Sequence, residues 1–456
     1  MRRQRLLALL LVLATVLAGC SVPSFGGSDH PATPAGEDAV GWEDGYWYDD
    51  PVRVTTEDGL NETEREAVVA RTMARVEQIR QREFEETVPV SVISRAEYRN
   101  RSRGNGSGGG PPADPWNDQV WEALLLIGED SGSSEELDDT LSTTVQGYYS
   151  PSQDEIVIVS PTETPQIDRR TLSHELVHAL QDQHFGLNGS AETQDTQLSR
   201  QGVTEGEANY VRIFYERRCG DQWECIALPD RTSESGDAGD GNGSAAQEPS
   251  YNEGLFTVLY QPYVTGPAFV HAIRDEGGWD AVDALHDDFP DSTEQVLHPE
   301  KYPDEKPVAV SVSDRSTDAW NRFDHDPVGD TVGEASIYAT VYHNGQTEGD
   351  RYSYESEASE GWAGDLVVPY RNGSGGYGYV WETRWDTEED AREFADAYRG
   401  ALVEEHDASQ PRANVYVVPE GDQFADAFRV VRSGKTVRIV NGPTVDDLSE
   451  IHPTEA

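Results

Sequence analysis

Lysine is almost absent from this chain of 456 residues. It occurs at Lys301, Lys306 and Lys435, so the 35 basic residues are nearly all Arg, and 85 acidic residues oppose them. The formal net charge of −50 argues against nucleic-acid binding, which requires a basic surface. An acidic disordered chain is a poor match too, because 36% of the residues are hydrophobic and ten are Trp. We interpret the acidity as adaptation to molar salt, in which a Debye length of about 3 Å screens self-repulsion.

Cysteine is also scarce. Besides Cys20, the chain has Cys219 and Cys225, which flank the sequence GDQWE. This spacing is not that of a zinc knuckle. In an oxidising environment outside the cell, two cysteines this close predict a local disulfide.

Long apolar runs are missing except at the N-terminus, where an apolar stretch follows a basic start and precedes Leu17-Ala18-Gly19-Cys20. This tetrapeptide resembles a lipobox and predicts cleavage before Cys20 with a lipid on its thiol, so that residues 1–20 are a lipoprotein signal peptide. The apolar run Leu6–Leu17 is shorter than the roughly 20 residues of a membrane span. An uncleaved anchor is the alternative, and either one places the body outside the cell. Arg2 and Arg3 suggest the twin-arginine export route, but Arg5 departs from that motif, so the route stays open.

The stretch that predicts chemistry is LSHELVHALQDQHF, from Leu172 to Phe185. Its His174, Glu175 and His178 form the pattern HExxH. Residues four apart share one face of a helix, so both imidazoles can bind one metal ion. Glu175 would then lie beside the metal as a general base, which is the arrangement of zinc metallopeptidases.

Zinc requires a third protein ligand and, in a catalytic site, an open position. The best candidate is Glu205 in the sequence TEGEANY, on a helix expected from Val203 to about Arg217. Glu207 is the rival ligand, but it lies on another helical face and is more simply interpreted as a solvated charge.

These motifs carry a resemblance to a known family. The HExxH helix followed by E-G-x-A resembles the gluzincin metallopeptidases, in which the Glu before Gly is the third zinc ligand. HELVHALQDQHF, EGEA and STEQVLHPEKY together resemble a group of secreted prokaryotic proteins whose haloarchaeal members are surface proteins. The resemblance extends from about Val52 onward and is specific at the three motifs. It implies a strand ahead of the HExxH helix that borders the cleft and pairs with an extended peptide.

Further site residues are predicted around this core. Asn209 lies one helical turn after Glu205, where it is predicted to orient one imidazole; plain helix surface is the alternative. His298, Tyr302 or Tyr263 is predicted to donate a hydrogen bond to a tetrahedral oxyanion beside zinc. For each of these three, a packed structural residue is the simpler interpretation.

The expected fold is α+β, with a zincin-like domain over residues 51–310 and a smaller α+β domain over 311–456. Residues 21–50 are rich in Gly, Pro, Ser and acid and predict a flexible tether whose aromatic end packs onto the body. The clearest expected elements are a helix capped at Asn61, a hairpin over 143–160, a helix capped at Asp386-Thr387, and a hairpin over 428–440.

The sequence therefore predicts a lipid-anchored zinc metallopeptidase on the cell surface of a halophile, acting on a peptide or protein with Zn²⁺ as cofactor. Two other hypotheses stay open: a non-catalytic zinc-binding envelope protein, and a solute- or metal-binding lipoprotein. Glu175 favours the enzyme, because neither binding nor structure needs a carboxylate at that position.

Overall fold

The computed structural model describes residues 39–54, 59–104, 113–160, 166–228 and 251–453. Residues 38–456 form one compact unit. The predicted signal peptide, Cys20 and most of the predicted tether lie outside the described residues. None of the described helices combines the length and the apolar character that crossing a membrane requires.

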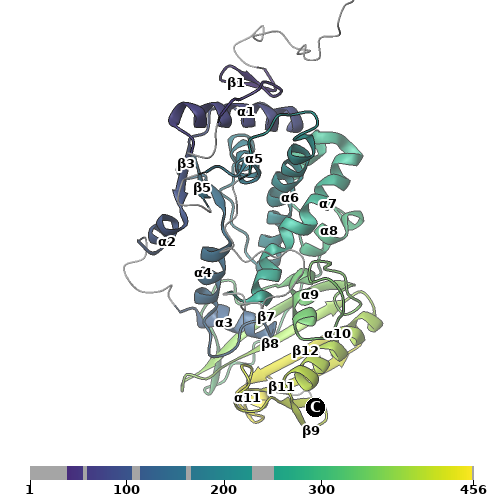
Figure 1. Ribbon diagram of the computed structural model, residues 1–456. Helices are drawn as coiled ribbons and strands as arrows, with labels where there is room; N and C mark the ends of the chain where they lie inside the picture. Colours follow the sequence, from purple (N-terminus) through teal and green to yellow (C-terminus); the bar gives the residue numbers. More distant parts are fainter. Residues whose placement is uncertain (1–38, 55–58, 105–112, 161–165, 229–250, 454–456) are drawn as a thin grey trace, which may run out of the picture. The chain divides into compact units, whose positions relative to one another are not determined.

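The described end of the predicted tether packs against the first long helix. A two-stranded ribbon, β1 (Trp42–Glu43) and β2 (Tyr46–Trp47), lies against α1 (Glu62–Arg80) (Figure 1). The backbone N–H of Gly41 donates to Glu77 Oε2 at 2.8 Å. The predicted capping box is confirmed, with Asn61 and Glu64 bonding each other's backbone. The helix ends at Arg80.

A three-stranded sheet has the order β3-β5-β4. Its strands are β3 (Val90–Ser94), β4 (Gly147–Ser150) and β5 (Glu155–Ser160). β4 and β5 form the predicted antiparallel hairpin, and β3 runs parallel to β5. Three helices connect β3 to β4: α2 (Arg95–Gly104), α3 (Pro115–Ala123) and α4 (Ser133–Thr144). The sequence did not predict α4.

Three long helices follow: α5 (Arg169–Phe185), α6 (Gln194–Arg218) and α7 (Glu253–Ala284), before the short segments α8 (Thr293–Leu297) and η1 (Pro299–Lys301). α5 and α6 pack together, and α6 packs along α7 (Figure 1). α6 begins nine residues before the predicted start, at a capping box on Thr193. The disulfide between Cys219 and Cys225 just after α6 is confirmed.

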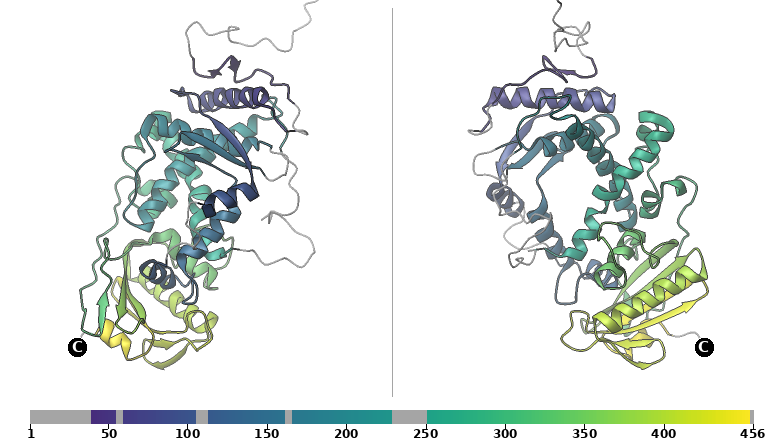
Figure 2. Two further views of the ribbon diagram at one scale, coloured as in Figure 1. Left: turned by 90° about the vertical axis from the view of Figure 1, so that its left-hand side faces the viewer. Right: turned by 45° about the vertical axis from the view of Figure 1, so that its right-hand side comes forward.

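The C-terminal part is an antiparallel seven-stranded sheet of order β6-β7-β8-β12-β11-β10-β9 with helices on both faces. One face packs on α3 and α10 (Figure 2). On this face, Trp381 of the sheet shares a core with Phe394 and Trp116. The other face packs on α11 through Leu448 and Ile451. The bounds are β6 (Trp320–Arg322), α9 (Gly333–His343), β7 (Trp362–Asn372), β8 (Tyr377–Trp385), α10 (Glu388–Gly400), the π-helical η2 (Ala401–Glu405), β9 (Ser409–Arg412), β10 (Val415–Val417), β11 (Ala427–Ser433), β12 (Thr436–Gly442) and α11 (Asp447–Ile451).

The predicted α+β class is confirmed. Residues on both sides of the predicted domain boundary near 310 share one hydrophobic core, since α3 and Leu255 of α7 pack with the C-terminal sheet and α10. The boundary itself stays a prediction.

Candidate metal centre

Helix α5 presents the two histidines of the HExxH pattern side by side. Its start is set by Asp168, whose carboxylate accepts from the backbone N–H of Arg170, and its end by Gly186 at φ 75°. Between them, Leu172 and Leu176 are fully buried. This packing turns the adjacent face, with His174 and His178, toward α6.

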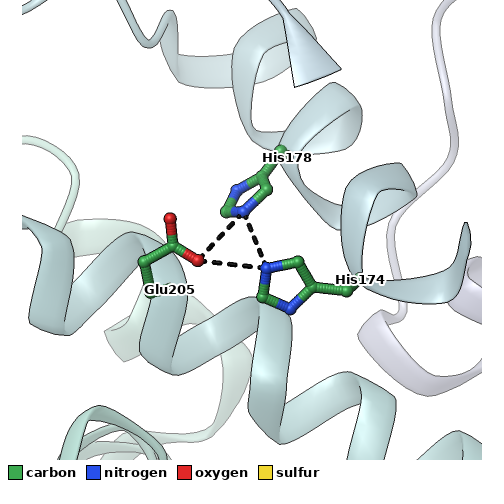
Figure 3. A group of neighbouring side chains, drawn as sticks. All are labelled: His174, His178 and Glu205. Carbon is green, nitrogen blue, oxygen red and sulfur yellow. Dashed lines mark hydrogen bonds and ion pairs between the residues drawn. The ribbon is translucent and has the colours of Figure 1, made fainter. Parts of the chain in front are cut away.

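Helix α6 brings Glu205 to the same point (Figure 3). Glu205 Oε2 lies 3.0 Å from His174 Nε2 and 3.2 Å from His178 Nε2, and the two nitrogens are 3.1 Å apart. The structure thus brings together the three residues predicted to be ligands. They come from two helices, and Glu205 follows His178 by 27 residues in the sequence.

These three atoms fit the ligand set of a zinc ion. Ligands at about 2.0–2.1 Å from zinc in tetrahedral geometry lie about 3.3 Å from one another, close to the spacings seen here. Two imidazole nitrogens and a carboxylate oxygen are also donor types that zinc prefers. Three protein ligands leave a fourth position for a non-protein group.

Gln181, one turn after His178, orients the ring of that histidine. Its amide nitrogen donates to Thr204 O at 3.1 Å and to Glu207 Oε2 at 2.9 Å. Its amide oxygen therefore faces His178 Nδ1, 2.9 Å away, and accepts a hydrogen bond from the Nδ1–H group. This bond leaves the lone pair on Nε2, the atom that faces Glu205.

The predicted role of Asn209 as the orienting residue is wrong. Its amide nitrogen donates to the backbone oxygen of Tyr263 at 3.0 Å, and its amide oxygen accepts from Arg212 Nε at 2.9 Å. Asn209 therefore anchors α7 against α6. The signal for Gln181 was present in the sequence, at three residues from His178 on the same face of the helix.

Glu207 is neither a ligand nor a solvated charge. It is 1% exposed and pairs with Arg80 of α1 and with His286 Nε2, the latter at 2.9 Å. Burial opposes its ionisation, but the charge of Arg80 and the bond to His286 lower its pKa below the usual range. Glu207 therefore stays charged and holds the Gln181 amide in the orientation that His178 needs.

Glu175 is buried at the centre, 6% exposed, between the two histidines in sequence. Burial raises its pKa, and the nearby charges of His174 and His178 partly offset that rise. The backbone N–H of Tyr149 in β4 donates to its carboxylate. A carboxylate held this way, with a raised pKa, suits a group that accepts and returns a proton.

The three converging side chains favour a positive charge between them. Burial alone would lower the pKa of His178, but the charge and hydrogen bond of Glu205 outweigh burial and raise it to about 9. Burial would raise the pKa of Glu205, yet the two histidines lower it well below its usual value. A proton or a metal cation is therefore favoured at this point.

Tyr263 of α7 lies beside the three side chains. Its ring stacks on that of His174 with centroids 6.0 Å apart, and its hydroxyl donates to Glu205. The two other predicted donors have different partners: His298 Nε2 lies 3.1 Å from Glu334 Oε1, and Tyr302 donates to Asp288 O at 2.7 Å. Of the three, Tyr263 is the one that the structure places at this centre.

Strand β4 offers an open edge next to Glu175. It ends the order β3-β5-β4 among the described strands. Val159 N donates to Gln146 O at 2.8 Å, so Gln146, Tyr148 and Ser150 are the positions bonded to β5, because such pairs alternate in an antiparallel ladder. Gly147 and Tyr149 therefore point their backbone groups away from β5, on the side where Tyr149 reaches Glu175.

Residues 321–452 match a family model described as a domain of unknown function, DUF8575. The match begins in β6 and ends just after α11, so it covers most of the seven-stranded sheet and does not include His174, His178 or Glu205. No curated protein and no solved structure matches the chain.

Proposed function

We propose that this protein is a zinc metallopeptidase of the gluzincin type. The observation that carries the proposal is the convergence of His174 Nε2, His178 Nε2 and Glu205 Oε2 at 3.0–3.2 Å, with the buried carboxylate of Glu175 on the same helix. His174, His178 and Glu205 would hold the ion. Zinc bound there supplies a Lewis acid that polarises a peptide carbonyl and makes water nucleophilic near neutral pH.

The protein's own groups divide the remaining work. Glu175 takes the proton of the attacking water and returns it to the amine that leaves. Gln181 keeps the proton of His178 on Nδ1, so that Nε2 stays available as a ligand. The hydroxyl of Tyr263, which bonds Glu205, would donate to the carbonyl oxygen as negative charge develops on it.

The open edge of β4 supports a peptide as substrate. Backbone groups of Gly147 and the carbonyl oxygen of Tyr149 point away from β5 and can pair with an extended chain, which gives binding that depends little on side-chain sequence. Because the N–H of Tyr149 also bonds Glu175, a peptide on this edge lies next to the proposed base.

A non-catalytic zinc protein is the main alternative. A structural zinc ion would need the three ligands but would gain nothing from Glu175. Among the described residues, the buried carboxylate of Glu175 forms no ion pair with Lys or Arg. A buried carboxylate that makes no such pair destabilises a purely structural site. This observation favours the enzyme.

The deciding experiment measures zinc content and peptide cleavage together, in molar salt, for the wild type, Glu175→Gln and the control Glu192→Gln. Glu192 is exposed on the connection between α5 and α6. We expect one zinc per chain in all three proteins and cleavage in the wild type and the control, with activity of Glu175→Gln lower by about 10²–10⁴-fold. Zinc without cleavage in any of the three would favour the non-catalytic alternative, and chains that bind no zinc would refute the proposal.

The location is a separate proposal, carried by the lipobox-like sequence that ends at Cys20. We propose that a lipid on Cys20 holds the protein on the outer face of the cell membrane. Cys20→Ser should then move the protein from the membrane fraction into the medium or leave its signal peptide uncleaved. An unchanged mature mass and membrane association in Cys20→Ser would contradict this.

A further inference from the structure

A cluster of three carboxylates lies outside the proposed zinc site. It contains Glu122 of α3, Glu129 in the turn that follows, and Asp426 just before β11, with carboxylate oxygens within 4.8 Å of one another. Glu122 is 2% exposed and Asp426 is 5% exposed, whereas Glu129 reaches the surface. The cluster therefore has two buried acids and one opening to solvent.

Buried polar atoms without hydrogen-bond partners lie in and beside this cluster. They are Glu122 Oε1, Gln119 Oε1 and both amide atoms of Asn441, Oδ1 and Nδ2, in side chains that are at least nine-tenths buried. Gln119 lies against the cluster because its amide nitrogen donates to Glu122 Oε2, and Asn441 lies against Asp426. Buried acceptors of this kind are costly unless they bind a proton donor or a cation.

No basic side chain balances these charges in the described part of the chain, where no ion pair to the three acids is found. The strongest influences on Glu122 besides burial are the charges of Asp426 and Glu129, which raise its pKa further. Another acidic cluster differs in having a basic side chain among its carboxylates. Glu294, Glu305 and Asp386 also converge, but Lys301 Nζ lies among them, 2.6 Å from Glu294 Oε1 and 3.0 Å from Glu305 Oε1.

We propose that Glu122, Glu129 and Asp426, with the amide oxygens of Gln119 and Asn441, bind one Ca²⁺ ion. Ca²⁺ takes six to eight oxygen ligands, including carboxylates and side-chain amides, at about 2.3–2.6 Å, so ligands on opposite sides of it lie up to about 5 Å apart. The observed spread of at most 4.8 Å fits this span. Mg²⁺ usually keeps several waters and uses one or two carboxylates, so three carboxylates and two amides favour Ca²⁺.

This site would join α3 to the C-terminal sheet. The two parts already meet there, since the N–H of Glu129 donates to Gln423 O at 2.9 Å and a Cβ at Gly128 would lie 2.7 Å from the same oxygen. α3 also packs against β7 and β8 of that sheet (Figure 1). A cation bound by Glu122 on one side and by Asp426 and Asn441 on the other would lock this contact.

The test measures calcium binding by titration calorimetry and the midpoint of thermal unfolding, on the full chain in molar salt. CaCl₂, MgCl₂ and a calcium chelator are compared for the wild type, Glu122→Gln, Asp426→Asn and the control Glu294→Gln. The first two variants remove one buried charge with little change in shape, so they should fold at least as well as the wild type without calcium. His174→Ala is added to keep the outcome separate from that of the proposed zinc centre.

We expect one Ca²⁺ per chain and a rise in the unfolding midpoint with calcium in the wild type, Glu294→Gln and His174→Ala. In Glu122→Gln and Asp426→Asn, the rise should disappear and calcium affinity should fall by roughly tenfold or more. An equal response in all proteins would place calcium elsewhere and overturn the proposal. An equal response to MgCl₂ would overturn it as well. So would a wild type that does not respond to calcium, because protons alone would then satisfy the three carboxyl groups.

Discussion

At the scale of single residues, the proposed metal centre depends on the side chains that orient the proposed ligands as well as on those ligands. Gln181 is the clearest of these, since its amide connects His178 to the buried Glu207 and, through it, to Arg80. These contacts determine which ring nitrogen of His178 carries the proton. The zinc affinity of the proposed site therefore depends on a hydrogen-bond network that extends to α1.

Gln181→Leu tests this network. Without the amide oxygen, His178 loses the acceptor on Nδ1, and we expect zinc affinity to fall by about 10–100-fold, measured by competition with a chromogenic chelator. Gln183→Leu is the matched control, because Gln183 lies on the same helix but bonds the backbone of Glu85 and Glu86. Equal losses in the two variants would mean that Gln181 acts through helix stability alone.

Tyr263→Phe tests the hydroxyl beside Glu205. If this hydroxyl stabilises the developing oxyanion, kcat should fall by about 10²-fold while the zinc content stays at the wild-type level. Tyr260→Phe is the control, since Tyr260 stacks on Tyr263 but is exposed. Similar kcat values for both variants would exclude a role of the Tyr263 hydroxyl in the reaction.

At the scale of elements, the crossing of α6 and α7 decides where Glu205 lies. Gly206, the residue after this ligand, packs directly on Gly266: a Cβ at Gly206 would lie 2.6 Å from the backbone carbon of Gly266. The close packing of α6 on α7 thus explains why the EGEA motif has a glycine at this position. Any side chain there would push the two helices apart.

Gly206→Ala should destabilise the fold by about 1–3 kcal/mol, because backbone atoms of α7 cannot move aside as a flexible side chain can. It should also weaken zinc binding by shifting Glu205. At Gly202 a Cβ would meet only the side chain of Val296, at 2.9 Å, and alanine favours helices by about 1 kcal/mol, so Gly202→Ala should cost less than Gly206→Ala. Thermal unfolding of both variants measures the difference, and a Gly206→Ala protein as stable as Gly202→Ala would contradict this packing.

At the scale of the whole molecule, buried acids join the start of α6 to α8 and, through Asp330, to the C-terminal part. Asp195 at the start of α6 accepts from the N–H and hydroxyl of Thr293, and Asp330 accepts from the N–H of Gln194. Burial raises the pKa of Asp195 to about 8 and that of Asp330 to about 7. In this acidic protein the junction therefore holds protons near neutral pH.

Stability should fall as pH rises through this range. The folded protein keeps protons on these groups that the unfolded chain has released above its carboxyl pKa of about 4, so the free energy of unfolding decreases between about pH 4 and 8, by up to about 1.4 kcal/mol per pH unit for each proton. Asp195→Asn keeps an oxygen acceptor for Thr293 and should flatten this fall in thermal unfolding measured across pH. The exposed Asp318→Asn is the control, and an unchanged slope in Asp195→Asn would rule out this origin.

Local features were determined by the sequence. The caps at Asn61 and Thr387 and the hairpin predicted over 428–440 are where the pattern placed them, because the atoms involved are a few residues apart. The pairing of His174 with His178 belongs to the same class, since helical periodicity alone puts residues four apart on one face.

Contacts between distant elements were decided only by the tertiary structure. The sequence left Glu205 and Glu207 as rival ligands, and the crossing of α5 and α6 turns the first toward the histidines and the second toward Arg80. The same holds for Gln181 in place of Asn209, and for α3, whose Trp116 packs in the C-terminal core. Which of several polar side chains meets a given partner depends on how helices far apart in the chain pack, and no periodicity within one helix contains that information.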